Sequence, residues 1–78
     1  MNTSKESLFK RLFDARLVCY KHTLNSDERS AIAAAQFAVE DMMSTYKRYV
    51  RDISEKEAMS QLEMEVEDIE KAAKGYQS

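Results

Sequence analysis

The chain has 78 residues, of which 44% are apolar and 33% are charged, and its formal net charge is −2. These values are typical of one globular domain. The sequence contains one Gly, Gly75, and no Pro. Glycine-rich phosphate-binding loops are therefore excluded, and the tight turns that join antiparallel strands are disfavoured. We expect one all-α domain over residues 1–78.

Helix-capping signals divide this domain into three expected helices. Thr3-Ser4-Lys5-Glu6 and Ser54-Glu55-Lys56-Glu57 fit capping boxes, and Asn25-Ser26-Asp27-Glu28 offers a cap followed by acids in the first turn. Gly75 stands where a left-handed C-cap is expected. The signals predict helices over approximately 4–23, 27–52 and 55–74. Because neither Gly nor Pro lies near Ile53, the alternative is that the last two helices continue as one bent rod.

Apolar residues recur every three or four positions in each expected helix, as on a buried helix face. The first helix has a second apolar stripe beside its main one, and the second has small residues in its first half and bulky ones in its second. We expect a hairpin of two long antiparallel helices plus a narrower, acidic third helix. The predicted core faces are Leu8, Leu12, Ala15 and Cys19; Ala31, Ala35, Ala38, Met42, Tyr46 and Tyr49; and Met59, Leu62, Val66, Ile69, Ala73 and Tyr76.

The length of the second helix predicts self-association. At about 1.5 Å per residue, a helix over 27–52 is roughly 39 Å long, whereas a compact chain of this size has a radius of gyration near ~12 Å. A core this small contributes only a few kcal/mol by itself. We therefore expect a homo-oligomer, in which a second copy covers the overhanging apolar surface.

Catalytic and metal-binding signals are weak. Cys19 and His22 are three residues apart, but the sequence contains no further Cys or His to complete a zinc site. Cys19 also lies on the apolar stripe, where a thiol is a core residue rather than a nucleophile. We expect no enzyme activity, no metal and no cofactor. A single cysteine and the absence of a long apolar run favour a cytoplasmic protein without a membrane segment.

Charge is distributed unevenly along the chain. Residues 1–24 carry five bases and two acids (+3), residues 25–54 carry four and five (−1), and residues 55–78 carry three and seven (−4). Lys47, Arg48 and Arg51 form a basic end of the second helix, and an antiparallel hairpin would bring Lys10 and Arg11 to them. Five cations would bind a phosphate, a nucleotide or a nucleic acid. The simpler interpretation is a set of solvated charges.

The third helix carries most of the acids, with Glu63, Glu67 and Asp68 as the candidate contact residues. Three interpretations are open for this acidic surface: a solvated outer face, a docking surface for a basic protein, or a mimic of the nucleic-acid backbone. Two apolar residues lie off the stripes, Phe37 in the second helix and Met64 in the third. We expect the third helix to cover Phe37; the alternative is an exposed anchor for a partner.

These observations favour a non-enzymatic protein-protein interaction module that acts as a regulator, inhibitor or co-chaperone of a macromolecular partner. The candidate contact residues are Phe37, Lys47, Arg48 and Arg51, with Glu63, Glu67 and Asp68 as a second surface. A phosphate, nucleotide or nucleic-acid binder acting through the basic end is the first alternative. An acidic nucleic-acid mimic acting through the third helix is the other.

Overall fold

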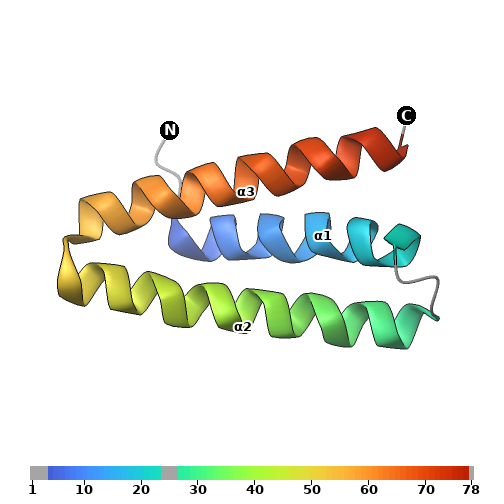
Figure 1. Cartoon of the computed structure of the whole chain (residues 1–78), viewed down its shortest axis with the longest axis horizontal. Coiled ribbons are helices and arrows are strands. Elements are labelled where there is room, and N and C mark those ends of the chain that lie inside the picture. The colour runs from blue at the N-terminus through green and yellow to red at the C-terminus, as the bar shows by residue number, and fades with distance from the viewer. Residues whose placement is uncertain (1–3, 24–26, 78) are drawn as a thin grey trace.

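A computed structural model of the chain describes residues 4–23 and 27–77, and within them it contains helices and no strand (Figure 1). The helices are α1 (Lys5–Thr23), α2 (Glu28–Asp52) and α3 (Glu55–Gln77). They lie side by side, and each runs antiparallel to the one before it in the chain (Figure 1). The radius of gyration is 13.0 Å and the extents are 38 × 23 × 16 Å. The all-α prediction is thereby confirmed.

Side-chain caps explain where the first two helices begin. The Ser4 hydroxyl accepts the backbone N–H of Ser7 at 3.1 Å, and the Asp27 carboxylate accepts that of Ser30 at 2.8 Å. Each cap satisfies a backbone donor that has no partner within the first turn of a helix. The hydrogen bond to Ser30 lowers the pKa of Asp27. The Ser4 hydroxyl therefore caps α1, and Thr3 of the predicted capping box lies outside the described residues.

The chain turns sharply between α2 and α3 and does not continue as one bent rod. Ile53 leaves the helical conformation with φ −123° and ψ −80°. The N–H groups of Ile53 and Ser54 both donate to the carbonyl of Tyr49, at 2.8 and 3.1 Å. The Ser54 hydroxyl then accepts the N–H of Glu57 at 3.1 Å and starts α3. In a complete capping box, the side chain of Glu57 would accept the backbone N–H of Ser54. Here that N–H donates to the carbonyl of Tyr49 instead.

The prediction of a left-handed C-cap at Gly75 is wrong, because α3 continues through it to Gln77 and Gly75 does not have a left-handed φ. A glycine within a helix costs about 1 kcal/mol relative to alanine. One contact that holds this last turn is a stack between the rings of His22 and Tyr76, whose centroids are 5.0 Å apart. The stack fixes the end of α3 against the end of α1.

The core lies mainly between α1 and α3, which contact each other more extensively than either contacts α2. Leu8, Leu12, Leu62 and Val66 are the largest fully buried side chains. Most of the predicted core faces of α1 and α3 are buried or half-buried, whereas Tyr76 is exposed. The main cluster consists of Leu8, Leu12, Phe9, Tyr46, Ala58, Leu62 and Val66, and a smaller one of Ala15, Cys19 and Ala73.

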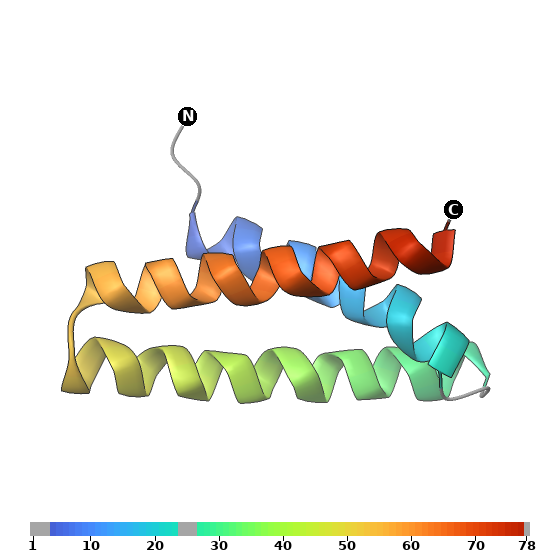
Figure 2. The ribbon, with the colours of Figure 1, turned by 45° about the horizontal axis from the view of Figure 1, so that its top comes forward.

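α1 is the shortest helix and crosses its neighbours obliquely (Figure 2). Both α2 and α3 extend beyond the residue at which α1 begins (Figures 1 and 2). At this end of the molecule α2 and α3 therefore pack together without α1. None of the described helices combines the length and apolar character needed to cross a bilayer.

Candidate protein-interaction surface

Phe37 is 71% exposed on the outer side of α2, so the prediction that the third helix covers it is wrong. The buried residues of α2 are Ala31, Ala35 and Tyr46. Phe37 is two positions after Ala35, which places it about 200° around the helix axis from the core. In a three-helix bundle each helix buries one face, and Phe37 lies on the opposite side of its helix.

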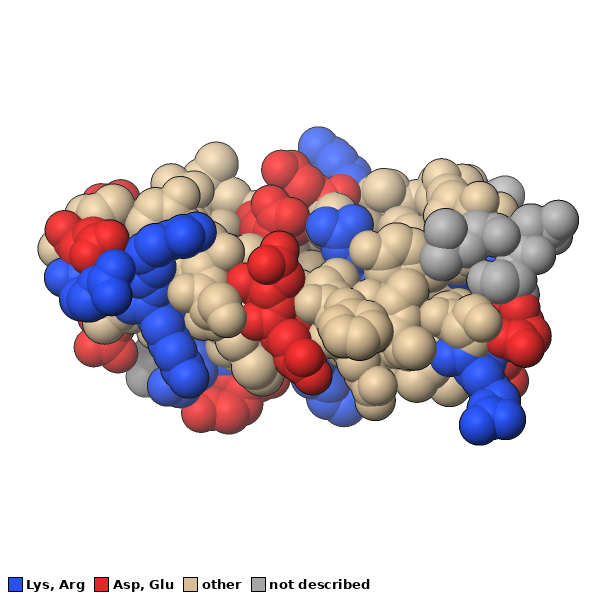
Figure 3. Space-filling model, turned by 60° about the horizontal axis from the view of Figure 1, so that its bottom comes forward, with Lys and Arg blue, Asp and Glu red and all other residues tan. Residues whose placement is uncertain are grey.

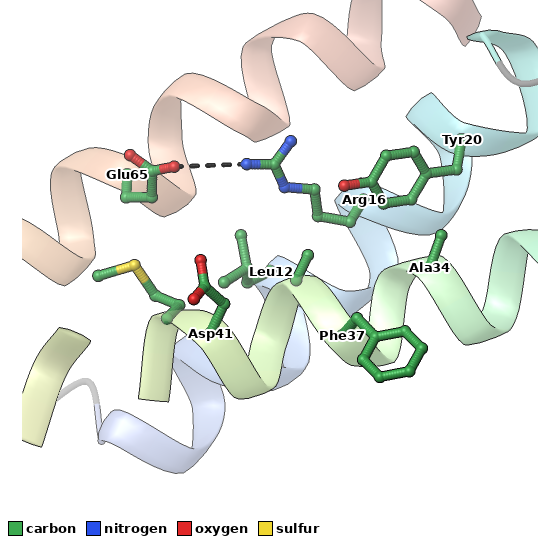
Figure 4. A pocket seen from close by; sticks show the side chains of 9 residues that line it. Leu12, Arg16, Tyr20, Ala34, Phe37, Asp41 and Glu65 are labelled. Carbon is green, nitrogen blue, oxygen red and sulfur yellow. Dashed lines mark hydrogen bonds and ion pairs between the residues drawn. The ribbon is translucent and has the colours of Figure 1, made fainter. Parts of the chain in front are cut away.

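A groove with a volume of about 740 Å³ runs beside Phe37 (Figure 4). Small side chains of α2 open it, because Ala34 and Ala38 leave space between α2 and the other helices. The alanines of α2 predicted that another helix approaches it closely. They did not predict that Ala34 and Ala38 would line a groove. Its lining residues are Leu12, Arg16 and Tyr20 of α1, Ala34, Phe37, Ala38, Asp41 and Met42 of α2, and Glu65 of α3.

The groove contains polar groups that sequence reasoning missed. Arg16 donates to Glu65 at 3.5 Å, and its guanidinium lies 5.9 Å from the centre of the Tyr20 ring (Figure 4). The Arg16 Nε is buried and has no hydrogen-bond partner among the residues that the structure describes. Buried donors are nearly always paired, so this unpaired N–H is an unusual feature of the groove lining. Asp41 adds a carboxylate to the lining.

The predicted cluster of five cations does not form. Arg11 faces α3, where its Nε and Nη2 donate to the two carboxylate oxygens of Glu70 at 2.9 and 2.6 Å. This hydrogen bonding lowers the pKa of Glu70 and raises that of Arg11. Lys10 pairs with Asp14 on α1 at 3.3 Å. The hairpin topology is compatible with the cluster, but Arg11 lies on the side of α1 that faces the acids of α3.

The basic end of α2 consists of three exposed cations. Arg51 pairs with its neighbour Asp52 at 2.9 Å, whereas Lys47 and Arg48 form no ion pair with any residue that the structure describes. Basic side chains gather at this end of the molecule in Figure 3. At this end of α2, α1 contributes Lys5, whose Nζ lies 5.9 Å from the centre of the Tyr46 ring. Sequence reasoning missed Lys5, although it lies one helical turn before Phe9.

The acids of α3 fall into two groups. Glu65 and Glu70 are half-buried and pair with cations of α1. The predicted contact residues Glu63, Glu67 and Asp68 are exposed, and no ion pair joins them to another described residue. The structure therefore separates acids that hold the bundle together from acids that face outward.

Cys19 and His22 are not brought together into a metal site. Cys19 is buried in the smaller cluster, and the ring of His22 is stacked on Tyr76. Across residues 4–23 and 27–77, no group of three or more His, Cys, Asp or Glu could hold a metal ion.

Comparison with protein families, with curated proteins and with solved structures finds no match to this chain. The functional argument therefore rests on the exposure, shape and charge of the surfaces described above.

Proposed function

We propose that the protein is a non-enzymatic interaction module that binds another protein through the groove beside Phe37. In this role it regulates, inhibits or escorts its partner without acting chemically on it. The observation that carries the proposal is Phe37 itself, an aromatic side chain 71% exposed at the edge of a groove of about 740 Å³. Exposed aromatic residues beside a groove are typical anchors of protein interfaces.

The shape of the groove favours an α-helix of the partner. Ala34 and Ala38 are one turn apart, and their small side chains permit another helix to approach the backbone of α2 closely. Met42, which also lines the groove, is flexible enough to adapt to an incoming apolar side chain. Arg16, Asp41 and Glu65 add charged groups beside these apolar residues. Such a groove would bind an amphipathic helix by its apolar face.

We further propose that the chain is a homo-oligomer. Phe37, Met43, Val50, Ile53, Met64 and Tyr76 are large apolar residues that remain exposed in a single copy. Three of them lie on α2, two lie on α3, and Ile53 lies in the turn between these helices, so one docked partner helix would not cover them all. Single exposed apolar residues are common on monomers, but clustered ones favour association.

A second candidate function is phosphate or nucleic-acid binding by the basic end of α2. The observation that favours it is the exposure of Lys47 and Arg48 without an ion pair among the described residues. Binding of this kind depends steeply on salt concentration. Because Arg11 and Lys10 are engaged elsewhere, fewer cations are available than the sequence suggests. We therefore rank this function second.

The test is capture of the partner by tagged wild-type chain and by the variant Phe37→Asp in the cell of origin. Gln36→Asp is the matched control, because it adds the same charge in the same turn to an exposed residue that does not line the groove. We expect Phe37→Asp to lose the proteins that both wild type and Gln36→Asp retain. Equal capture by all three would refute the proposal. If capture is lost instead in Lys47→Glu with Arg51→Glu and depends steeply on salt, the second function is correct.

A further inference from the structure

The end of α2 carries an apolar stripe that α1 covers only in part. Met43, Tyr46 and Val50 are spaced by three and four residues and share one face of α2, and Ile53 follows them as the C-cap residue. Tyr46 is buried under Phe9, whose ring meets it edge to face at a centroid distance of 6.0 Å. The other three are exposed, and Ile53 is 60% exposed. We call these four residues the overhang stripe: Phe9 and Lys5 of α1 contact its first half, and Val50 and Ile53 continue it toward the turn that leads to α3.

A hollow of about 220 Å³ lies where the overhang stripe meets the first turn of α1. Its walls are apolar, formed by Phe9, Met43 and Tyr46, and its rim carries Lys5, Lys47 and Glu6. This volume is below the ~300 Å³ at which small-molecule pockets begin, so the hollow fits one side chain rather than a metabolite. The rim has a net positive charge, because it carries two lysines and one glutamate, and exposed Arg48 lies next to Lys47. The hollow therefore favours an apolar side chain that has acidic residues around it.

The chain presents such a side chain on its own α3. Met64 is 56% exposed on the outer face of that helix. Glu63 precedes it, and Glu67 and Asp68 lie one turn further along, all three exposed. None of these acids is ion-paired to another described residue, so their charge is available to a partner. Methionine is unbranched and flexible, which suits it to an irregular hollow.

We propose that the chain self-associates by docking the outer face of α3 of one copy on the overhang stripe of another, with Met64 in the hollow. Charge complementarity favours a second copy as the occupant: Lys5 and Lys47 would face Glu63, Glu67 and Asp68. The two surfaces belong to different helices. A two-fold dimer therefore forms if both contacts are made at once, and a longer assembly forms if they are not. This contact rests on the self-association proposed above but does not involve the Phe37 groove, so its failure leaves partner binding at that groove unaffected.

Sedimentation equilibrium of the purified chain across the micromolar range tests the contact. We expect the wild type to have a mass above that of one chain, with association weakened by high salt. Lys47→Glu and Glu67→Lys should each weaken self-association about tenfold or more, because each places like charges across the interface. An equimolar mixture of the two variants should recover association, since the reversed charges face each other again. Circular dichroism establishes that each variant is folded.

Arg29→Glu is the matched control, because Arg29 is an exposed cation five helical turns before Lys47 on the same side of α2. It should associate like the wild type, as should Phe37→Asp. Met64→Ala should weaken association without changing the net charge. A wild type with the mass of one chain throughout would overturn the proposal. So would folded single variants that associate normally, or a mixture that stays dissociated.

Discussion

The interface between α1 and α3 differs in construction from the packing of α2. The first buries large side chains, Leu8 and Leu12 against Leu62 and Val66, and is flanked by the bidentate pair of Arg11 and Glu70. Of the 25 residues of α2, three are buried, and two of these are alanines. Since buried area and packing set most of the stability, α1 and α3 hold the fold together. α2 is held by smaller contacts, which leave its outer face and its end free for partners.

The largest expected effect comes from breaking the α1–α3 core. Leu62→Ala removes a side chain that is fully buried in the main cluster and should lower the free energy of unfolding by about 3 kcal/mol. Met64→Ala, two residues along the same helix but exposed, should change it by less than about 0.5 kcal/mol. Urea unfolding followed by circular dichroism, at concentrations where both variants have the same oligomeric state, measures both. Similar losses in the two variants would show that the core is placed incorrectly.

A smaller effect is expected from the ion pair beside this core. The Arg11 and Glu70 side chains are 41% and 32% exposed, so Glu70→Gln should cost about 1 kcal/mol rather than the several kcal/mol of a fully buried pair. The guanidinium lowers the pKa of Glu70 from its ordinary value of 4.5. The stabilisation is therefore complete above that value and is lost as the pH falls through the lowered pKa of the folded state.

The measurement is urea unfolding of wild type and Glu70→Gln from neutral to acid pH. The difference between them should be constant near neutrality and shrink below about pH 4.5. Glu40→Gln, at an exposed residue without an ion pair among the described residues, should match the wild type across the range. A difference that grows on acidification would contradict the stabilising role of the pair.

The fold was predictable because capping and periodicity are local. Asp27 and Ser54 cap their helices by hydrogen bonds to backbone groups three residues away, which can be read from neighbouring letters of the sequence. Leu8, Leu12 and Leu62 recur with the spacing of a buried face and are buried. The last turn of α3 differs from the prediction, because the contact between Tyr76 and His22 joins distant parts of the chain.

The candidate surfaces were harder to predict. Periodicity shows which face of a helix is buried, but it does not show which neighbouring helix packs against that face. Arg11 was expected beside the basic end of α2, yet it lies against Glu70, because it is on the side of α1 that packs against α3. Lys5, rather than Arg11, is the cation of α1 that lies near the basic end of α2. The groove depends on the positions of three helices at once, and the sequence alone gave no indication that Arg16 and Glu65 would line it.

The smallest expected effect is on the outer face of α2, where Phe37→Ala should leave the free energy of unfolding unchanged or raise it by up to about 0.5 kcal/mol. Phe37 loses little by truncation because it is 71% exposed, and alanine has the higher helix propensity. Phe9→Ala is the contrasting variant: Phe9 is buried against Tyr46, and its loss should cost about 3 kcal/mol. Thermal unfolding of the two variants distinguishes a packing role, expected for Phe9, from an exposed binding role, expected for Phe37. If Phe37→Ala lost as much as Phe9→Ala, the ring would be a packing residue, and its exposure could no longer support a binding role.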